Sequence, residues 1–307
     1  MRRFLVLAVL ACLVLGSVAP AAGQDPDSLA RYIVLVAENL MNQETAIFEG
    51  NSTVTVSMDM GGASQVVEAV SDISGQYVFA EGEADFEAWY TIEEIELTMT
   101  MPGAGQMAFD LTVESLMTDA TLYERTTSNN PMFASAFEEG WTILDDAAGT
   151  PGANPMADPT GMLPGIDVTK LPYVIGEDTV ATVTELPPET IEDGREMRVF
   201  EIKLDMENVA SQFGAWMSGM LPAEEEEGAG AAPDELLSGL LAEMETTWTM
   251  WIDPVTELPY RSTGTMKGPM TLDQQGMTLI MDLAVEFDMT FTEFSTPVTI
   301  EPPELGS

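Results

Sequence analysis

The chain has no histidine, and its single cysteine is Cys12, among 307 residues. Without imidazole groups or a second thiol, the sequence excludes histidine-based catalysis, His/Cys metal sites and an intrachain disulfide bond. The nucleophile-elbow, phosphate-loop and dinucleotide-binding motifs are also missing. We therefore expect a protein without enzymatic activity, cofactor or metal ion.

Basic residues are scarce as well, because 10 Lys and Arg stand against 52 Asp and Glu, giving a net charge of −42. Disordered acidic chains are poor in apolar residues, whereas 45% of this chain is hydrophobic, so we expect it to fold. The charge repels phosphate backbones, and we expect no nucleic-acid partner. So many acids place carboxylates close together by chance, and we identify no catalytic pair among them.

The N-terminal segment has the layout of a secretory signal peptide. Arg2 and Arg3 precede the apolar run "FLVLAVLACLVLGSV", and the small residues of "APAAGQD" follow. This pattern predicts removal of residues 1–23 and export to the periplasm or the extracellular space. Cys12 would tether the protein to a membrane if it were lipidated, but the apolar run continues beyond it.

Residues 277–291, "MTLIMDLAVEFDMTF", carry an apolar side chain at every odd position. Such alternation predicts a long strand with one dry face and one polar face. Residues 27–43 have the apolar spacing of a helix. Hairpins are expected around the turns at 102–105 and 192–194. Further strands are expected at 53–60, 121–126, 140–146, 246–253 and 258–268, and further helices at 206–221 and 234–244.

This order of elements predicts an α+β fold for residues 24–307, as a single domain with flexible loops at about 147–165 and 223–233. A single large curved antiparallel sheet would carry helices over its hydrophobic concave face. The chain has 22 methionines, and those in the strands fall mainly on dry faces. They belong either to an ordinary core or to a cavity for variable apolar ligands, because the methionine side chain adapts to irregular shapes.

Three segments resemble LolA-like lipoprotein carriers and the related LppX/LprG-type lipid-binding lipoproteins. These are "LYERTTSNNPMFASAFEEGWTILDD" (122–146), "TWTMWIDPVTELPYR" (247–261) and "FTEFSTPVTIEPPE" (291–304). The resemblance implies a half-open barrel around a hydrophobic cavity that holds acyl chains of a lipid or lipoprotein. It also implies an exported carrier, here expected to be monomeric, with an unidentified partner in the cell envelope.

On this reading, the cavity lining comes from the dry faces of the strands and from the two later helices. The expected residues are Val54, Val56, Met58, Met60, Met99, Met101, Met107, Phe109, Phe200, Ile202, Phe213, Trp216, Leu237, Leu240, Trp248, Met250, Met281, Leu283 and Phe287. The alternative is a secreted structural or adhesive β-rich domain in which the same face is simply filled. An outer-membrane barrel fits less well, because helices interrupt the strands.

Overall fold

A computed structural model describes residues 26–59, 64–79, 86–101, 105–118, 121–130, 140–143, 179–209, 244–274 and 277–305. Helix α2 spans Pro26–Met41. The strands are β1 (Thr45–Asp59), β2 (Ser64–Phe79), β3 (Phe86–Met101), β4 (Gly105–Thr118), β5 (Thr121–Ser128), β6 (Thr142–Ile143), β7 (Val180–Thr190), β8 (Glu196–Leu204), β9 (Glu245–Ile252), β10 (Pro259–Gln274) and β11 (Met277–Phe294).

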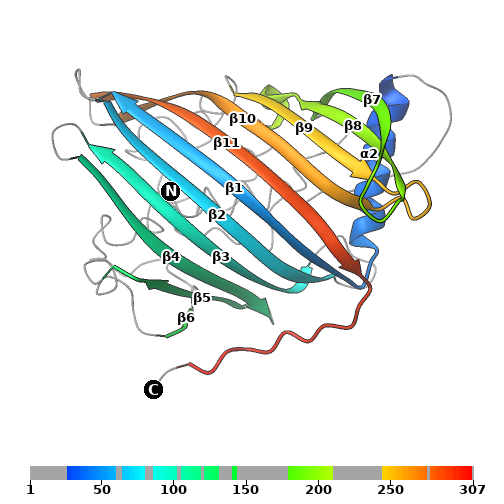
Figure 1. Cartoon of the computed structure of the whole chain (residues 1–307), viewed down its shortest axis with the longest axis horizontal. Helices are drawn as coiled ribbons and strands as arrows, with labels where there is room; N and C mark the ends of the chain where they lie inside the picture. The colour runs from blue at the N-terminus through cyan, green and yellow to red at the C-terminus, as the bar shows by residue number, and fades with distance from the viewer. Residues whose placement is uncertain are drawn as a thin grey trace, which may run out of the picture.

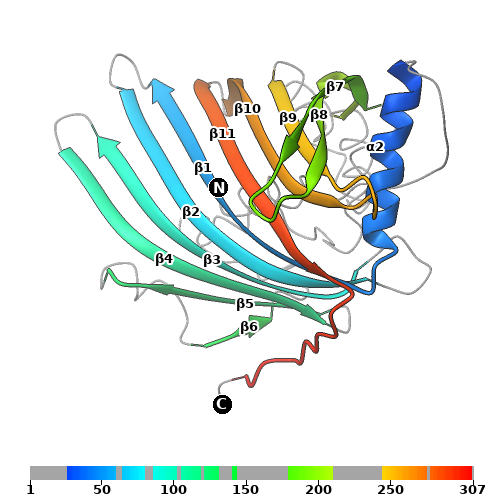
Figure 2. The ribbon, with the colours of Figure 1, turned by 45° about the vertical axis from the view of Figure 1, so that its right-hand side comes forward.

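The 11 strands form one antiparallel sheet in the order β6-β5-β4-β3-β2-β1-β11-β10-β9-β8-β7. Consecutive strands pair with each other, apart from β6 and β7, and at the centre the first strand pairs with the last. Within the described residues, β6 and β7 are the two edges, so the sheet is not closed. Figures 1 and 2 show that the strands bend strongly along their length. The prediction of one large curved antiparallel sheet is confirmed.

The register at the centre of the sheet separates an apolar face from a polar face. Val54 lies opposite Val285, and Met58 lies opposite Met281, on what we call the apolar face. Asn51 lies opposite Asp288 on the other side, the polar face. The long alternating strand predicted at 277–291 is observed as the 18 residues of β11. Both predicted hairpins are also present, as β3–β4 and β7–β8.

Helix α2 covers one end of the apolar face. The helix was predicted at 27–43 and begins with Pro26, which is favourable in the first turn because proline lacks an N–H group. Its buried residues Ile33, Val36 and Ala37 pack against side chains of β7, β8 and β9. Figure 2 shows α2 standing beside this end of the sheet.

A further helix begins at 206, as predicted. The Asp205 carboxylate caps it by accepting a hydrogen bond from the backbone N–H of Asn208 at 3.1 Å. Residues 210–243 lie outside the described residues, and with them the rest of the predicted helix at 206–221, all of the predicted helix at 234–244 except Met244, and the loop at 223–233. The loop at 147–165 lies outside them as well. Helical cover over the whole apolar face therefore stays a prediction.

Aromatic side chains fill the apolar face next to the C-terminal end of α2. Phe48 is almost fully buried and stacks on Tyr77 with ring centroids 5.0 Å apart. Phe291 packs at a tilt against Phe48, and Trp89 belongs to the same buried cluster. This cluster joins α2, the centre of the sheet and β3, and we call it the aromatic cluster.

On the polar face, three side chains link β3, β4 and β5. The Tyr90 hydroxyl donates to Glu114 Oε1 at 2.9 Å, and Arg125 Nε donates to Glu114 Oε2 at 2.6 Å. Burial and the hydrogen bond to Glu114 raise the pKa of Tyr90 to about 12. The folded protein therefore keeps the tyrosine proton at a pH where the unfolded chain, with a pKa of about 10, has lost it.

Alkaline stability should depend on Tyr90 for this reason. Because its folded pKa is raised, its contribution is present below pH ~10 and is lost as the pH rises from ~10 to ~12. We expect Tyr90→Phe to remove this part of the alkaline decline while lowering stability slightly at neutral pH. Urea unfolding at a series of pH values checks this. An unchanged alkaline slope in the variant would contradict it.

Candidate functional site

All the predicted lining residues that the structure describes lie on the apolar face, as the cross-strand register shows. They are Val54, Val56, Met58, Met99, Met107, Phe109, Phe200, Ile202, Trp248, Met250, Met281, Leu283 and Phe287. Met60, Phe213, Trp216, Leu237 and Leu240 lie outside the described residues, and of Met101 only the backbone is described.

The predicted lining residues differ in their contact with α2. Phe200, Ile202, Trp248 and Met250 are buried in one cluster with the helix side chains. Phe200 and Ile202 have no exposed surface at all. This group therefore forms a packed core between α2 and the sheet.

The second group lies farther along the apolar face, and no residue of α2 belongs to it. We call it the distal patch. Its buried members are Val54, Val56, Ala69, Ile95, Val113 and Val285, and the half-buried side chains packed against them are Met58, Leu97, Leu111, Met266, Met281 and Leu283. Six strands, from β4 across the centre to β10, contribute to this patch.

Buried polar residues separate the distal patch from the aromatic cluster. Ser52 and Ser71 share a hydrogen bond of 2.8 Å between β1 and β2. Farther along the sheet, Glu93, Ser115 and Thr126 are also buried, with Glu93 only 4% exposed. Across β1 to β5, this band separates the distal patch from the aromatic cluster.

The chain passes over the distal patch at two points. Met206 and Val209, at the start of the second helix, cluster with Met244, which directly precedes β9. Met266 and Leu283 of the distal patch pack against this cluster. The segment from 210 to 243 therefore leaves and rejoins the described structure at the edge of the distal patch.

Beyond the distal patch, the apolar face meets solvent towards the β3–β4 turn. Met107, opposite Met99 in the register, is 42% exposed although it is on the apolar face. Met99 itself is half-buried. Partly exposed methionines at the rim of an apolar surface are suited to contacts with ligands of variable shape.

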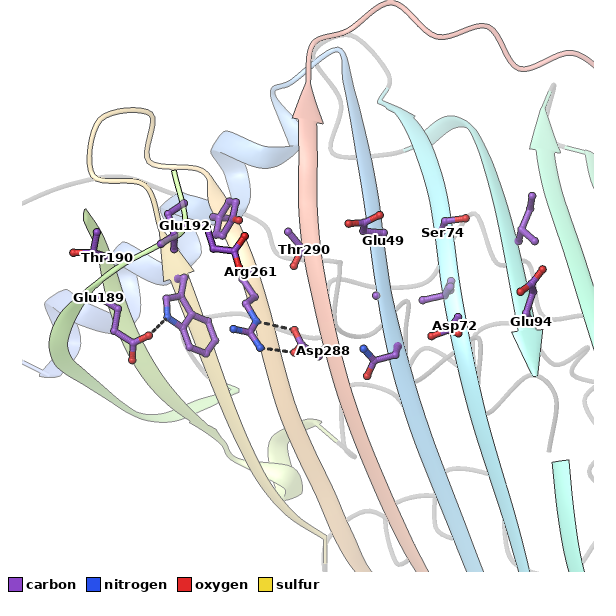
Figure 3. Close-up of a pocket in the computed structure, with 17 residues that line it drawn as sticks. Glu49, Asp72, Ser74, Glu94, Glu189, Thr190, Glu192, Arg261, Asp288 and Thr290 are labelled. Carbon is purple, nitrogen blue, oxygen red and sulfur yellow. Dashed lines mark hydrogen bonds and ion pairs between the residues drawn. The ribbon is translucent and has the colours of Figure 1, made fainter. Parts of the chain in front are cut away.

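The polar face carries a groove that the sequence did not suggest, with a volume of about 860 Å³. Figure 3 shows its side chains projecting from neighbouring strands. The lining residues are Glu49, Gly50, Asn51, Asp72, Ile73, Ser74, Ile92, Glu94, Glu189, Thr190, Ile191, Glu192, Trp251, Tyr260, Arg261, Asp288 and Thr290. Six of these are acids and one is basic, so the groove is strongly anionic.

Arg261 is held at the centre of the groove. Its Nε donates to Asp288 Oδ1 at 2.8 Å, and a second nitrogen donates to the other oxygen of the same carboxylate. The hydrogen bond to Asp288 raises the pKa of Arg261 further above its usual value. The guanidinium also lies over the Trp251 ring, and Trp251 Nε1 donates to Glu189 at 2.9 Å.

Arg195 links the β7–β8 turn to the sheet at one end of the groove. It donates to Asp193 at 2.6 Å and to Asp253 at 2.7 Å, and it lies over the Tyr260 ring. Burial alone would raise the pKa of Asp253. Hydrogen bonds from the N–H groups of Val255 and Thr256 and from Arg195 outweigh burial and lower it. Gly194 takes a positive φ of 86°, which lets the turn close beside Arg195.

The described part of the chain holds no group of three or more acidic or cysteine side chains arranged to bind a metal ion. None of its helices has both the length and the apolar character that crossing a membrane requires.

Neither a protein-family model nor a curated protein matches the sequence. Among solved structures, the chain is similar to a DUF1329 family protein from Desulfovibrio piger, with a TM-score of 0.23 and 12% identity, covering 91% of this chain and 96% of that one. It is also similar to a β-barrel-like protein of the domain of unknown function DUF1849 from Brucella abortus, with a TM-score of 0.22 and 10% identity, covering 81% and 100%. The outer membrane protein OprG from Pseudomonas aeruginosa matches with a TM-score of 0.18 and 7% identity, covering 81% and 94%. At these TM-scores, none of the likenesses supports an argument about function.

Proposed function

We propose that the protein is an exported, non-enzymatic carrier that binds the acyl chains of lipids or lipoproteins on the distal patch. One observation carries this proposal. The distal patch is an apolar surface on six strands that includes no residue of α2 and whose methionine and leucine side chains are only half-buried. A sheet that served only to form a core would be expected to bury these side chains fully, as it does under α2.

The energetics favour an acyl ligand on such a surface. Burying one methylene group contributes about 0.8 kcal/mol, so about ten buried methylenes contribute roughly 8 kcal/mol before the entropic cost of binding. Met58, Met266 and Met281 lie on three neighbouring strands and supply unbranched side chains that adapt to chains of different length.

The resemblance to LolA-like and LppX/LprG-type proteins supports the same function. In this proposal the curved sheet is the wall of a half-open barrel, and the segment between Val209 and Met244 covers its cavity. The signal-like residues 1–23 are removed on export, and the mature protein acts as a monomer in the periplasm or outside the cell. In the alternative, a structural or adhesive domain, the packed core that lies under α2 would continue over the whole apolar face.

A tryptophan at position 281 tests the proposal. Met281 lies opposite Met58 in the register and is half-buried in the distal patch. We expect Met281→Trp to occupy ligand volume, to abolish saturable binding of a fluorescent fatty acid, and to change the melting temperature by only a few degrees. Binding and thermal unfolding are measured on delipidated protein, and organic extracts of the purified protein are analysed by mass spectrometry.

Two variants control this experiment. Asp282→Trp adds the same ring to the adjacent, exposed position on the polar face and should leave fatty-acid binding unchanged. Met250→Trp enters the packed core under α2 and should cost about 1–3 kcal/mol by overpacking. If wild type binds no fatty acid and Met281→Trp is destabilised as strongly as Met250→Trp, the distal patch is filled core and the structural alternative is correct.

A further inference from the structure

The anionic groove on the polar face contains a row of acidic and amide side chains, and the placement of the acids lowers the stability of the sheet. Asp72 lies directly opposite Glu94, and on its other side it faces Asn51, which in turn faces Asp288. Like charges that face each other across neighbouring strands lower the stability of a sheet. Glu49 projects from the same face of β1, two residues from Asn51 (Figure 3).

The charge of the groove is only partly compensated from within. Asp288 is neutralised by Arg261, and Glu189 accepts a hydrogen bond from Trp251. Glu49, Asp72 and Glu94 are exposed and form no ion pair with any residue that the structure describes. The groove therefore keeps an unbalanced negative charge beside aromatic rings.

The shape of the groove indicates a chain segment as its occupant. Its floor crosses six neighbouring strands, β3, β2, β1, β11, β10 and β9, and residues 189–192 form a wall at one end. Five gaps of ~4.8 Å between strands give a length of roughly 24 Å. An extended peptide of about seven residues has this length at ~3.3 Å per residue. A metal ion would fill only a small part of it, and phosphate-rich partners would be repelled.

We propose that this groove is a docking site for a basic segment of a partner protein. Lysine and arginine side chains of the segment would pair with Glu49, Asp72 and Glu94, and their aliphatic stems would lie along Trp251, Tyr260 and Ile92. The groove is on the opposite side of the sheet from the distal patch, so docking leaves the apolar face open. A carrier could therefore hold its ligand and its partner together, although the docking site does not depend on the carrier function.

Charge-neutralising variants test the site with a defined probe. The probe is a short fluorescein-labelled peptide of alternating lysine and alanine, measured by fluorescence anisotropy at low and at about 0.15 M ionic strength. The groove variant is Glu49→Gln, Asp72→Asn, Glu94→Gln. The matched control is Glu68→Gln, Glu96→Gln, Glu286→Gln, which removes three exposed acids from the polar faces of β2, β3 and β11 outside the groove.

The expected result is that the groove variant binds the peptide about tenfold more weakly, whereas the control loses less than about twofold. Salt should weaken the peptide's binding to wild type more steeply than its binding to the groove variant. Carbodiimide, which joins lysine amines to nearby carboxylates, should link the peptide to Glu49, Asp72 or Glu94. Equal losses in both variants, cross-links spread over the control positions, or no binding at low salt would each overturn the proposal.

Discussion

Truncating Phe48 to alanine is expected to lower the free energy of unfolding by about 3–5 kcal/mol, the usual range for a large side chain in a packed core. Phe48 is 1% exposed. Its ring stacks on Tyr77, packs against Phe291 and shares the aromatic cluster with Leu40 of α2. Alanine would leave a cavity where helix and sheet meet, and the stacked rings around it cannot collapse without losing their own contacts.

Urea unfolding followed by tryptophan fluorescence measures this loss. Val255→Ala is a suitable control, because Val255 is 88% exposed in the turn after β9 and its truncation should change stability by less than about 0.5 kcal/mol. A loss below about 1 kcal/mol for Phe48→Ala would mean that the aromatic cluster is loosely packed.

Elements with a regular apolar period could be predicted from the sequence. β11 alternates from Met277 to Phe291, and Val285, Met289 and Phe291 on its apolar face are buried. The helix α2 repeats Ile33, Val36 and Leu40 at helical spacing, and these residues are buried. In both elements the apolar period of the sequence matches the buried face of the folded protein. Under that condition the period predicts the type of element correctly.

β2 was not predicted, because apolar and polar residues do not alternate regularly along it. Ser71 and Gly75 occupy its apolar face, while Val66 and Val70 point to the polar face. The serine is accommodated by its hydrogen bond to Ser52, and the glycine by the Phe48 ring that lies over it. Both contacts are made by residues of β1, and the apolar period along β2 alone contains no information about them.

The anionic groove could not be predicted, because its two halves, on β1–β3 and on β9–β11, come together only through the pairing of β1 with β11. Glu49 and Asp288 are far apart in the sequence and meet at the centre of the sheet. In a chain with 52 acids, no local signal distinguishes these carboxylates from the others. Long-range pairing of this kind depends on the global topology and leaves no periodic trace.

The apolar face was predicted correctly, but its division was not. The alternation identifies Met250 and Met281 equally as inward-facing residues. Only the docking of α2 on β7, β8 and β9 shows that Met250 is packed core while Met281 belongs to the distal patch. The alternation therefore predicted which residues share the apolar face and not which of them lie under α2.

Gly75→Ala is expected to destabilise the protein by about 1–3 kcal/mol, because the new methyl group overpacks the aromatic cluster. A β-carbon at position 75 would lie 2.7 Å from Cζ of Phe48 and 2.7 Å from the carbonyl oxygen of Tyr90. The Phe48 ring cannot move aside easily, because it is stacked on Tyr77 and buried. Glycine is required here for the close approach of the ring.

The double variant Phe48→Ala, Gly75→Ala separates these two contacts. Removing the ring leaves space that the methyl group can occupy, so the double variant should be more stable than the sum of the single losses predicts, by about 0.5–3 kcal/mol. The contact with the Tyr90 carbonyl remains, so Gly75→Ala should still be mildly unfavourable in the Phe48→Ala background. Unfolding free energies of the four proteins give the coupling directly. Strict additivity would show that the β2–β3 backbone, and not the ring, excludes a side chain at position 75.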